Sequence, residues 1–123
     1  MANPNIVSVA SIYGKTVYDT DIATTASSLV NNAASSGKIF KINSLIIANI
    51  DGTDSADITV TLRNAAGGTT YSTLANTIAV PSDATLIVVS KDTSIYLEED
   101  MSLYVLASAA GDLSATCSYE EIS

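Results

Sequence analysis

The seven residues Asp57–Arg63, DITVTLR, alternate between apolar and polar side chains. Ile58, Val60 and Leu62 share one parity, and polar or charged residues occupy the other. Because successive side chains of a β-strand point to opposite faces, this alternation predicts a strand with one buried side. No segment of the chain keeps a helical period for three turns, so the remaining elements are also expected to be strands.

Short apolar or alternating runs recur along the chain, and turn residues such as Gly67-Gly68, Pro81-Ser82 and Gly111-Asp112 separate them. From residue 28 onward there are about seven or eight such runs, with turn signals roughly every 8–12 residues. This spacing is typical of an antiparallel sandwich. The Ser, Thr and Asn content of residues 23–34 argues against a helix there, because these side chains compete for backbone hydrogen bonds. We therefore predict an all-β fold, an antiparallel β-sandwich of about eight strands.

Three runs lead to more specific expectations. In residues 38–50, KIFKINSLIIANI, Ser44 interrupts one apolar parity, which predicts a bend or bulge that packs the two ends against different layers. In residues 71–80, the expected core positions are Leu74, Ile78 and Val80. In residues 85–90, TLIVVS, both parities are apolar, which predicts a strand covered on both faces. The second covered face is a candidate subunit contact, formed by Leu86, Ile87, Val88 and Val89.

The first 27 residues differ in character from the rest of the chain. They contain two strand-like patches, residues 6–13 and 15–18, which meet at Gly14. One interpretation is an edge hairpin of the sandwich, and the other is an arm that pairs with a neighbouring subunit. We accordingly divide the chain into an N-terminal arm or edge hairpin, residues 1–27, and a β-sandwich domain, residues 28–123. The residues of this segment expected in assembly contacts are Ile6, Val7, Val9, Ile12, Tyr13, Val17 and Tyr18.

Composition limits the partners that the chain can bind. Thirteen acidic residues against five basic ones give a net charge of −8. An acidic surface is repelled by phosphate backbones and by anionic lipid, so neither nucleic acid nor membrane is an expected partner. A single cysteine, Cys117, excludes an intramolecular disulfide and a thiolate-cluster metal site. Met1–Pro4 shows no basic region or long apolar run, which predicts a protein made and assembled in a cytoplasm.

The sequence offers no recognisable catalytic set. It has no histidine, no G-x-S-x-G turn and no phosphate-binding G-x-x-x-x-G-K segment. Two carboxylate groups, Glu98-Glu99-Asp100 and Glu120-Glu121, lie in an expected turn and near the chain end. Solvated carboxylates keep ordinary pKa values and make poor general acids. We therefore predict a protein that is not an enzyme and uses no cofactor.

The stretch NIDGTDSADITVTL, residues 49–62, places Asp51, Asp54 and Asp57 at every third position. An EF-hand counted from Asp51 would need glycine at its sixth position and glutamate at its twelfth. This chain has Ala56 and Leu62 there. A looser cation loop of the three aspartates stays open, but a turn that leads into the strand explains more residues. No metal site is predicted.

The six tyrosines are spread along the chain. Tyr71, Tyr96 or Tyr104 could line a carbohydrate-binding face. Tyrosines in a sheet more often pack at its margins or at subunit contacts, where the ring has one apolar and one polar side.

The order of these segments resembles small structural proteins from the virions of tailed bacteriophages, notably of cyanophages. The resemblance covers residues 28–123 and includes a strand ending in ANIDG, the segment SKDTSIYLEE, the strand SLYVLAS and a terminal SYEEI. One departure is at Asp100-Met101, where such proteins often have Gly-Asp, and it concerns turn geometry. The resemblance implies a β-sandwich, often jelly-roll-like, that works as a repeated accessory subunit.

Capsid decoration (cement) proteins of this kind commonly form homotrimers and bridge major capsid proteins. The resemblance therefore implies a structural virion protein on the capsid surface, assembled in the host cytoplasm, with itself and the major capsid protein as partners. Two alternatives stay open. One is a structural module of the tail, neck or baseplate, and the other is a carbohydrate-binding β-sandwich.

Overall fold

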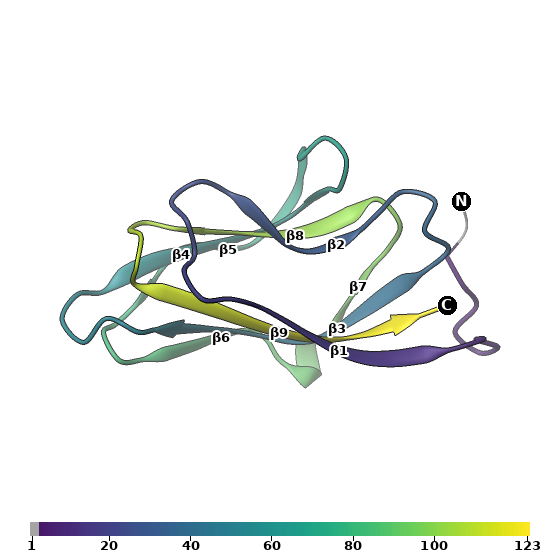
Figure 1. The fold of residues 1–123 in the computed structure, drawn as a ribbon, viewed down its shortest axis with the longest axis horizontal. Coiled ribbons are helices and arrows are strands. Elements are labelled where there is room, and N and C mark those ends of the chain that lie inside the picture. Colours follow the sequence, from purple (N-terminus) through teal and green to yellow (C-terminus); the bar gives the residue numbers. More distant parts are fainter. Residues whose placement is uncertain (1–2) are drawn as a thin grey trace.

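A computed structural model describes residues 3–123, in which nine strands form two antiparallel sheets packed face to face (Figure 1). Sheet A has the order β1 (Ile12–Asp19), β9 (Leu113–Ile122), β3 (Ile39–Asn49) and β6 (Thr85–Val89), and β7 (Ile95–Leu97) also pairs with β3. Sheet B has the order β2 (Ser27–Asn32), β8 (Met101–Ala107), β4 (Ala56–Asn64) and β5 (Thr70–Val80). A single 3-10 turn, η1 (Lys91–Thr93), precedes β7. No helix within residues 3–123 is long and apolar enough to cross a membrane.

The strand pairing is nested. The first strand pairs with the last, β2 pairs with β8, β3 pairs with β6 and β7, and β4 pairs with β5. The chain thus runs as one long hairpin that is wrapped into two layers, which is the topology of a jelly roll. The predicted antiparallel, jelly-roll-like β-sandwich is confirmed.

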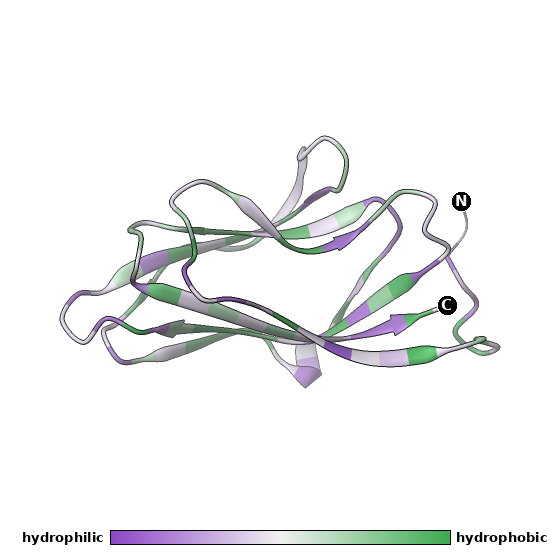
Figure 2. Cartoon of the chain, in the orientation of Figure 1, coloured by the Kyte–Doolittle hydropathy of each residue, from purple (hydrophilic) through white to green (hydrophobic). Residues whose placement is uncertain are grey.

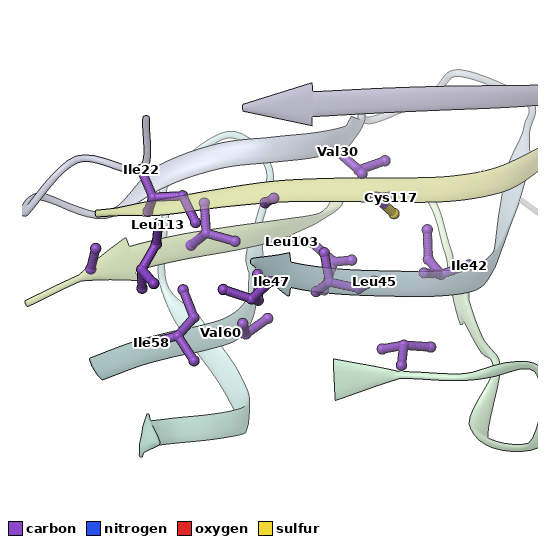
Figure 3. Packing of buried hydrophobic residues seen from close by; sticks show 14 of the residues in the cluster. Ile22, Val30, Ile42, Leu45, Ile47, Ile58, Val60, Leu103, Leu113 and Cys117 are labelled. Carbon is purple, nitrogen blue, oxygen red and sulfur yellow. The ribbon is translucent and has the colours of Figure 1, made fainter. Parts of the chain in front are cut away.

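The core lies between the two sheets (Figure 3). Ile58 and Val60 on β4 are fully buried, as their alternation predicted. Burying one such aliphatic side chain contributes roughly 1.5–3 kcal/mol relative to leaving it exposed. Other fully buried members of this cluster are Ile22, Ile42, Leu45, Ile47, Leu97, Leu103, Val105, Leu113 and Cys117.

β3 changes the parity that faces the core part-way along its length. Its register with β9 slips between Ile42 and Ser44. Before the slip Phe40 and Ile42 are buried in the core, and after it Leu45 and Ile47 are. The predicted bulge at Ser44 is confirmed, but its expected purpose was wrong. The two ends of the strand do not pack against different layers, because the bulge returns both of them to the same core.

β5 is more exposed than its sequence indicated. Val80 is buried as predicted, but Leu74 and Ile78 are 37% and 42% exposed, so their assignment to the core was wrong. β5 is the edge strand of sheet B, and its register with β4 shifts three times. Thr77 adopts a left-handed backbone conformation, with φ of 47°. These irregularities turn side chains of apolar parity away from the space between the sheets.

β1 is an edge strand of sheet A rather than half of a local hairpin. It pairs with β9 over its whole length, from Ile12 opposite Ile122 to Asp19 opposite Ala115. Gly14 lies inside β1, so the two strand-like patches do not form the edge hairpin that was one of the two interpretations, although β1 does add an edge strand. The first 27 residues therefore include one complete strand of the sandwich. Whether the residues before β1 act as an arm stays a prediction.

The aspartate stretch after β3 is organised by the buried side chain of Asn49. Its amide nitrogen donates to the carbonyl oxygens of Asp54 and Val80, at 3.0 and 2.9 Å, and its amide oxygen accepts from the N–H of Asp51 at 2.8 Å. The Asp51 carboxylate then accepts from the N–H of Thr53 at 2.9 Å. The stretch is thus a turn that delivers the chain into β4, whose first residue is Ala56.

The bulge in β3 predicts opposite outcomes for two adjacent isoleucines. Ile47→Ala removes a fully buried side chain and should lower the free energy of unfolding by about 2–5 kcal/mol. Ile46→Ala, half-buried on the other side of the strand, should cost about 1 kcal/mol or less. Urea unfolding of both variants measures the difference. A strand without the bulge would reverse the order of the two costs.

Candidate assembly surface

The side of sheet A that faces away from the core carries three aligned rows of residues. The longest row runs across four strands through Tyr18, Thr116, Ile46 and Ile87. Rows on either side of it contain only small residues. We call these rows the outer patch, which consists of Thr16, Tyr18, Ser44, Ile46, Ala48, Thr85, Ile87, Ser114, Thr116 and Ser118.

The outer patch carries no charge, although the chain has a net charge of −8. Its two largest exposed side chains, Tyr18 and Ile87, lie at opposite margins of the sheet and are 69% and 64% exposed. Figure 2 shows hydrophilic colouring near the C-terminal end of β9, where Glu120 and Glu121 lie, and neutral to hydrophobic colouring along its middle. An uncharged sheet face can be covered by a partner without desolvating any ionised group, and charge depletion is characteristic of interface centres.

The bulge in β3 decides which residues belong to the outer patch. Because the parity changes at Ser44, Ile46 and Ala48 face outward. In the sequence both share the parity of Phe40 and Ile42, so they could not be distinguished from core positions. The polar members were missed for another reason, since Ser and Thr on a strand look the same whether solvent or a partner covers them.

The four residues of β6 that were predicted for assembly do not all lie on the same face of the strand. Ile87 belongs to the outer patch, and Leu86 and Val88 are half-buried against the core. Val89 is buried in the core itself. On β1, Val17 also packs against the core, while Ile12 and Tyr13 are exposed. Within this chain Ile87 is exposed, so the expectation that a subunit contact covers the second face of residues 85–90 stays a prediction.

The N-terminal residues that precede β1 lie outside both sheets. The N–H of Ser8 donates to the carbonyl oxygen of Asn5, which forms a turn, and Val7 is 90% exposed. Ile6 is exposed and Val9 is half-buried. This segment lies at the same end of the sandwich as the C-terminus, and the N–H of Ala10 donates to the carbonyl oxygen of Ser123 at 2.7 Å (Figure 1).

A small ion-pair network lies beside the edge strand β1. Glu121 on β9 accepts from the ammonium groups of Lys15 and Lys38, at 3.2 and 3.3 Å. Burial opposes ionisation of this carboxyl, but the hydrogen bonds and charges of the two lysines outweigh it and lower the pKa of Glu121 below 4.5. Lys15 thereby has an acidic partner within its own chain, which it shares with Lys38.

The end of the sandwich that lies away from the C-terminus is strongly acidic. The N–H of Gly111 donates to the carboxylate of Asp21 at 2.7 Å. The pKa of Asp112 is raised, first by loss of solvation and then by the neighbouring Asp51 and Asp54. All five basic residues lie outside this region. We call it the acidic end, and its aspartates are Asp19, Asp21, Asp51, Asp54, Asp57, Asp83 and Asp112.

The three aspartates considered as a cation loop do not share one turn. Asp51 and Asp54 lie in the β3–β4 connection, and Asp57 lies on β4, where its N–H donates to Ser108. Among residues 3–123 no group of three or more His, Cys, Asp or Glu side chains is placed to hold a metal ion.

The carboxylate groups considered for catalysis are separated. Asp100 accepts from the side chain of Asn64 at 2.6 Å and terminates the β7–β8 turn. Both carboxylate oxygens of Glu99 are buried and make no hydrogen bond within residues 3–123, so the expectation that this turn is fully solvated was wrong. No pocket is found over the same residues.

The three tyrosines considered for carbohydrate binding do not form one surface. Tyr71 on β5 and Tyr104 on β8 belong to sheet B, whereas Tyr96 on β7 pairs with sheet A. The guanidinium of Arg63 stacks over the ring of Tyr104 at 4.9 Å, and Tyr71 accepts a hydrogen bond from Asn64 at 3.0 Å. These partners occupy one ring face and one hydroxyl group that a sugar would contact.

No family model and no curated protein matches the sequence. Among solved structures, the fold is similar to that of a chain of Bacillus endospore appendages, which form a family of disulfide-linked pili. The two chains are 19% identical, the TM-score is 0.53, and the match covers 92% of this chain and 88% of that chain. At this level of identity the similarity concerns the fold.

The Glu121 network predicts a pH-dependent contribution to stability. Glu121→Gln should lower the free energy of unfolding at pH 7 by about 1 kcal/mol or less. Because the pKa of Glu121 is lowered in the folded chain, the stabilisation is present above pH 4.5 and is lost as the pH falls through the folded value. Urea unfolding at pH 7 and pH 3 tests this, and the variant should match the original chain at pH 3. An equal difference at both pH values would contradict it.

Cys117 should be inert in the folded chain. Burial raises the pKa of this thiol to about 12, and its side chain is fully buried between the sheets. The thiolate is the reactive form, so a thiol-specific reagent at pH 7–8 should not modify the native chain and should modify one thiol after denaturation. Rapid labelling without denaturant would show that β9 opens readily.

Proposed function

We propose that this chain is a non-enzymatic structural subunit that acts by surface contact in a multi-copy particle. The observation that supports this most directly is the outer patch, an uncharged face with exposed Tyr18 and Ile87 on an otherwise acidic domain. A contact over this face need not be strong by itself. Many weak contacts, repeated over the copies in a particle, give high avidity.

The specific form that we propose is a decoration protein that stabilises the head of a tailed bacteriophage. The support is the resemblance of residues 28–123 to small virion proteins, together with the jelly-roll topology. On this proposal the partners are other copies of the chain, as the homotrimer that the resemblance implies, and the major capsid protein. The location is the capsid surface.

A second candidate is a subunit of a filament. It is favoured by the similarity to the chain of Bacillus endospore appendages, which extends over nearly the whole fold. Those pili are disulfide-linked. Cys117 is fully buried here, so it presents no accessible thiol for such a link, and a filament of this chain would be held by non-covalent contacts.

The copy number of the chain in purified particles distinguishes these forms. A capsid decoration protein should be present in hundreds of copies per particle, measured by quantitative mass spectrometry against the major capsid protein. Tens of copies or fewer would indicate a tail, neck or baseplate module. Filaments of the purified chain under the electron microscope, with no particle association, would favour the second candidate. Absence from particles and filaments would reject the proposal.

The outer patch can be tested with two matched substitutions. Ile87→Asp places a charge within the patch, and Ile50→Asp places the same charge in the β3–β4 connection, where Ile50 is also exposed. We expect Ile87→Asp to reduce particle occupancy at least tenfold, which corresponds to about 1.4 kcal/mol. Ile50→Asp should leave occupancy near that of the original chain, as measured by binding to particles that lack the protein. Equal occupancy for both variants would exclude the patch as the contact.

A further inference from the structure

The four outermost strands of the two sheets differ in how their open edges are protected. β6 and β2 are short, with 5 and 6 residues, and β2 also contains a register shift. β5 is long but is interrupted by three register shifts. Short strands, bulges and charged side chains, lysine especially, are ways in which proteins prevent edge-to-edge pairing. β1 is neither short nor bulged, since its 8 residues pair with β9 in an unbroken register and are mostly exposed, and its one lysine, Lys15, is paired with Glu121.

The hydrogen-bonding pattern shows which backbone groups of β1 face outward. Ser11 and Ser123 exchange two backbone hydrogen bonds, at 3.1 and 3.0 Å. Bonded and non-bonded pairs alternate along an antiparallel ladder, so the odd-numbered residues of β1 bond to β9. The N–H and C=O groups left facing the open edge belong to Ile12, Gly14, Thr16 and Tyr18. These groups point away from β9, and no other backbone group within residues 3–123 is hydrogen-bonded to them.

We propose that the open edge of β1 pairs with β1 of a second copy, antiparallel about a two-fold axis that passes beside Lys15. This inference rests on the part of the proposed function in which copies of the chain associate, and it puts a two-fold dimer in place of the homotrimer that the resemblance implies. In this register Ile12 lies opposite Tyr18 of the second copy, and Gly14 lies opposite Thr16. All four outward-facing residues of each strand then form bonded pairs, which gives about eight backbone hydrogen bonds.

The charge distribution favours a second copy in the antiparallel direction. Asp19 ends β1 at the acidic end, while Lys38, which directly precedes β3, lies towards the other end beside Glu121. Antiparallel pairing places the acidic end of one copy beside the lysine-containing end of the other. Parallel pairing would place two acidic ends side by side, where like charges repel.

The apolar rows of sheet A also become continuous in this arrangement. Ile12, Ile122 and Ile39 form a row across the outward side of one end of sheet A. In the proposed register this row continues into Tyr18 and Ile46 of the second copy, and thus into its outer patch. The contact therefore joins two sheets into one surface and leaves both outer patches on the same side of it.

Lys15 lies opposite Lys15 of the second copy, which is the one unfavourable pair of the register. Each ammonium is 3.2 Å from the Glu121 carboxylate of its own chain. Each Glu121 carboxylate, which is shared with Lys38, therefore lies close to the axis and offsets part of the repulsion between the two Lys15 ammonium groups. This compensation distinguishes the pair from two unbalanced like charges.

Gly14 provides a matched pair of variants. Gly14→Pro removes an N–H that faces the open edge, and it leaves the hydrogen bonds between β1 and β9 intact. Proline is tolerated at such outward-facing positions of edge strands. Gly14→Ala keeps that N–H, and a Cβ at this position meets nothing within 4 Å. In sedimentation equilibrium over a concentration series, the original chain and Gly14→Ala should approach twice the 12.7 kDa chain mass. Gly14→Pro should stay at the monomer mass, with a melting temperature that matches the original chain at concentrations where that chain is monomeric.

A cysteine on the two-fold axis tests the register independently of folding effects at Gly14. Directly opposed residues of a non-bonded pair are about 4.5 Å apart between Cα atoms, within disulfide range. Lys15→Cys should therefore cross-link to a dimer on mild oxidation, whereas Lys91→Cys, on the exposed turn η1, should cross-link at least tenfold more slowly.

A monomer at every concentration, a trimer, or equal cross-linking of the two cysteine variants would overturn the two-fold contact. If Gly14→Pro fails to fold, the cross-linking comparison alone decides. A dimer in solution combined with absence from particles would support the contact and reject the decoration function. A trimer combined with hundreds of copies per particle would reject the two-fold contact and support the decoration function.

Discussion

The bulge in β3 is the constraint on which both the core and the outer surface depend. β3 pairs with three other strands, so it sets the register of most of sheet A. Without the slip at Ser44, Leu45 and Ile47 would face solvent and Ile46 would enter the core. A single extra residue therefore keeps the aliphatic core complete and, at the same time, places Ile46 in the centre of the outer patch.

Strands with one buried face could be predicted from the sequence because their alternation is a local property. β4, β8 and β9 bury the residues that their parity indicated, including Val60, Val105 and Cys117. β5 failed this test because Leu74 and Ile78 have the same apolar parity, yet the strand lies at an edge and is bulged. Edge position depends on which distant strands pair, and a single strand's sequence does not encode that.

The candidate surface was only partly predictable for a related reason. Tyr18 and Ile87 were identified because Tyr18 lies in a strand-like patch of the N-terminal segment and Ile87 lies in a run that is apolar on both parities. Thr116, lying between them, carries no such signal, since threonine suits any solvent-facing strand position. Only the register, which aligns residues 18, 116, 46 and 87 across four strands, shows that these positions form one surface.

The placement of charge explains how an acidic chain can still associate with itself. Seven of the thirteen acidic residues lie at the acidic end, and the remaining six share the rest of the molecule with all five basic residues. The net charge of −8 is therefore concentrated at one end, away from the middle of sheet A. Repulsion between copies then depends on their relative direction, because salt screens charges separated by more than roughly 8–10 Å. When two copies pair side by side in opposite directions, their acidic ends are separated by most of the strand length. The charge that keeps the chain soluble therefore also selects the direction in which copies can pair.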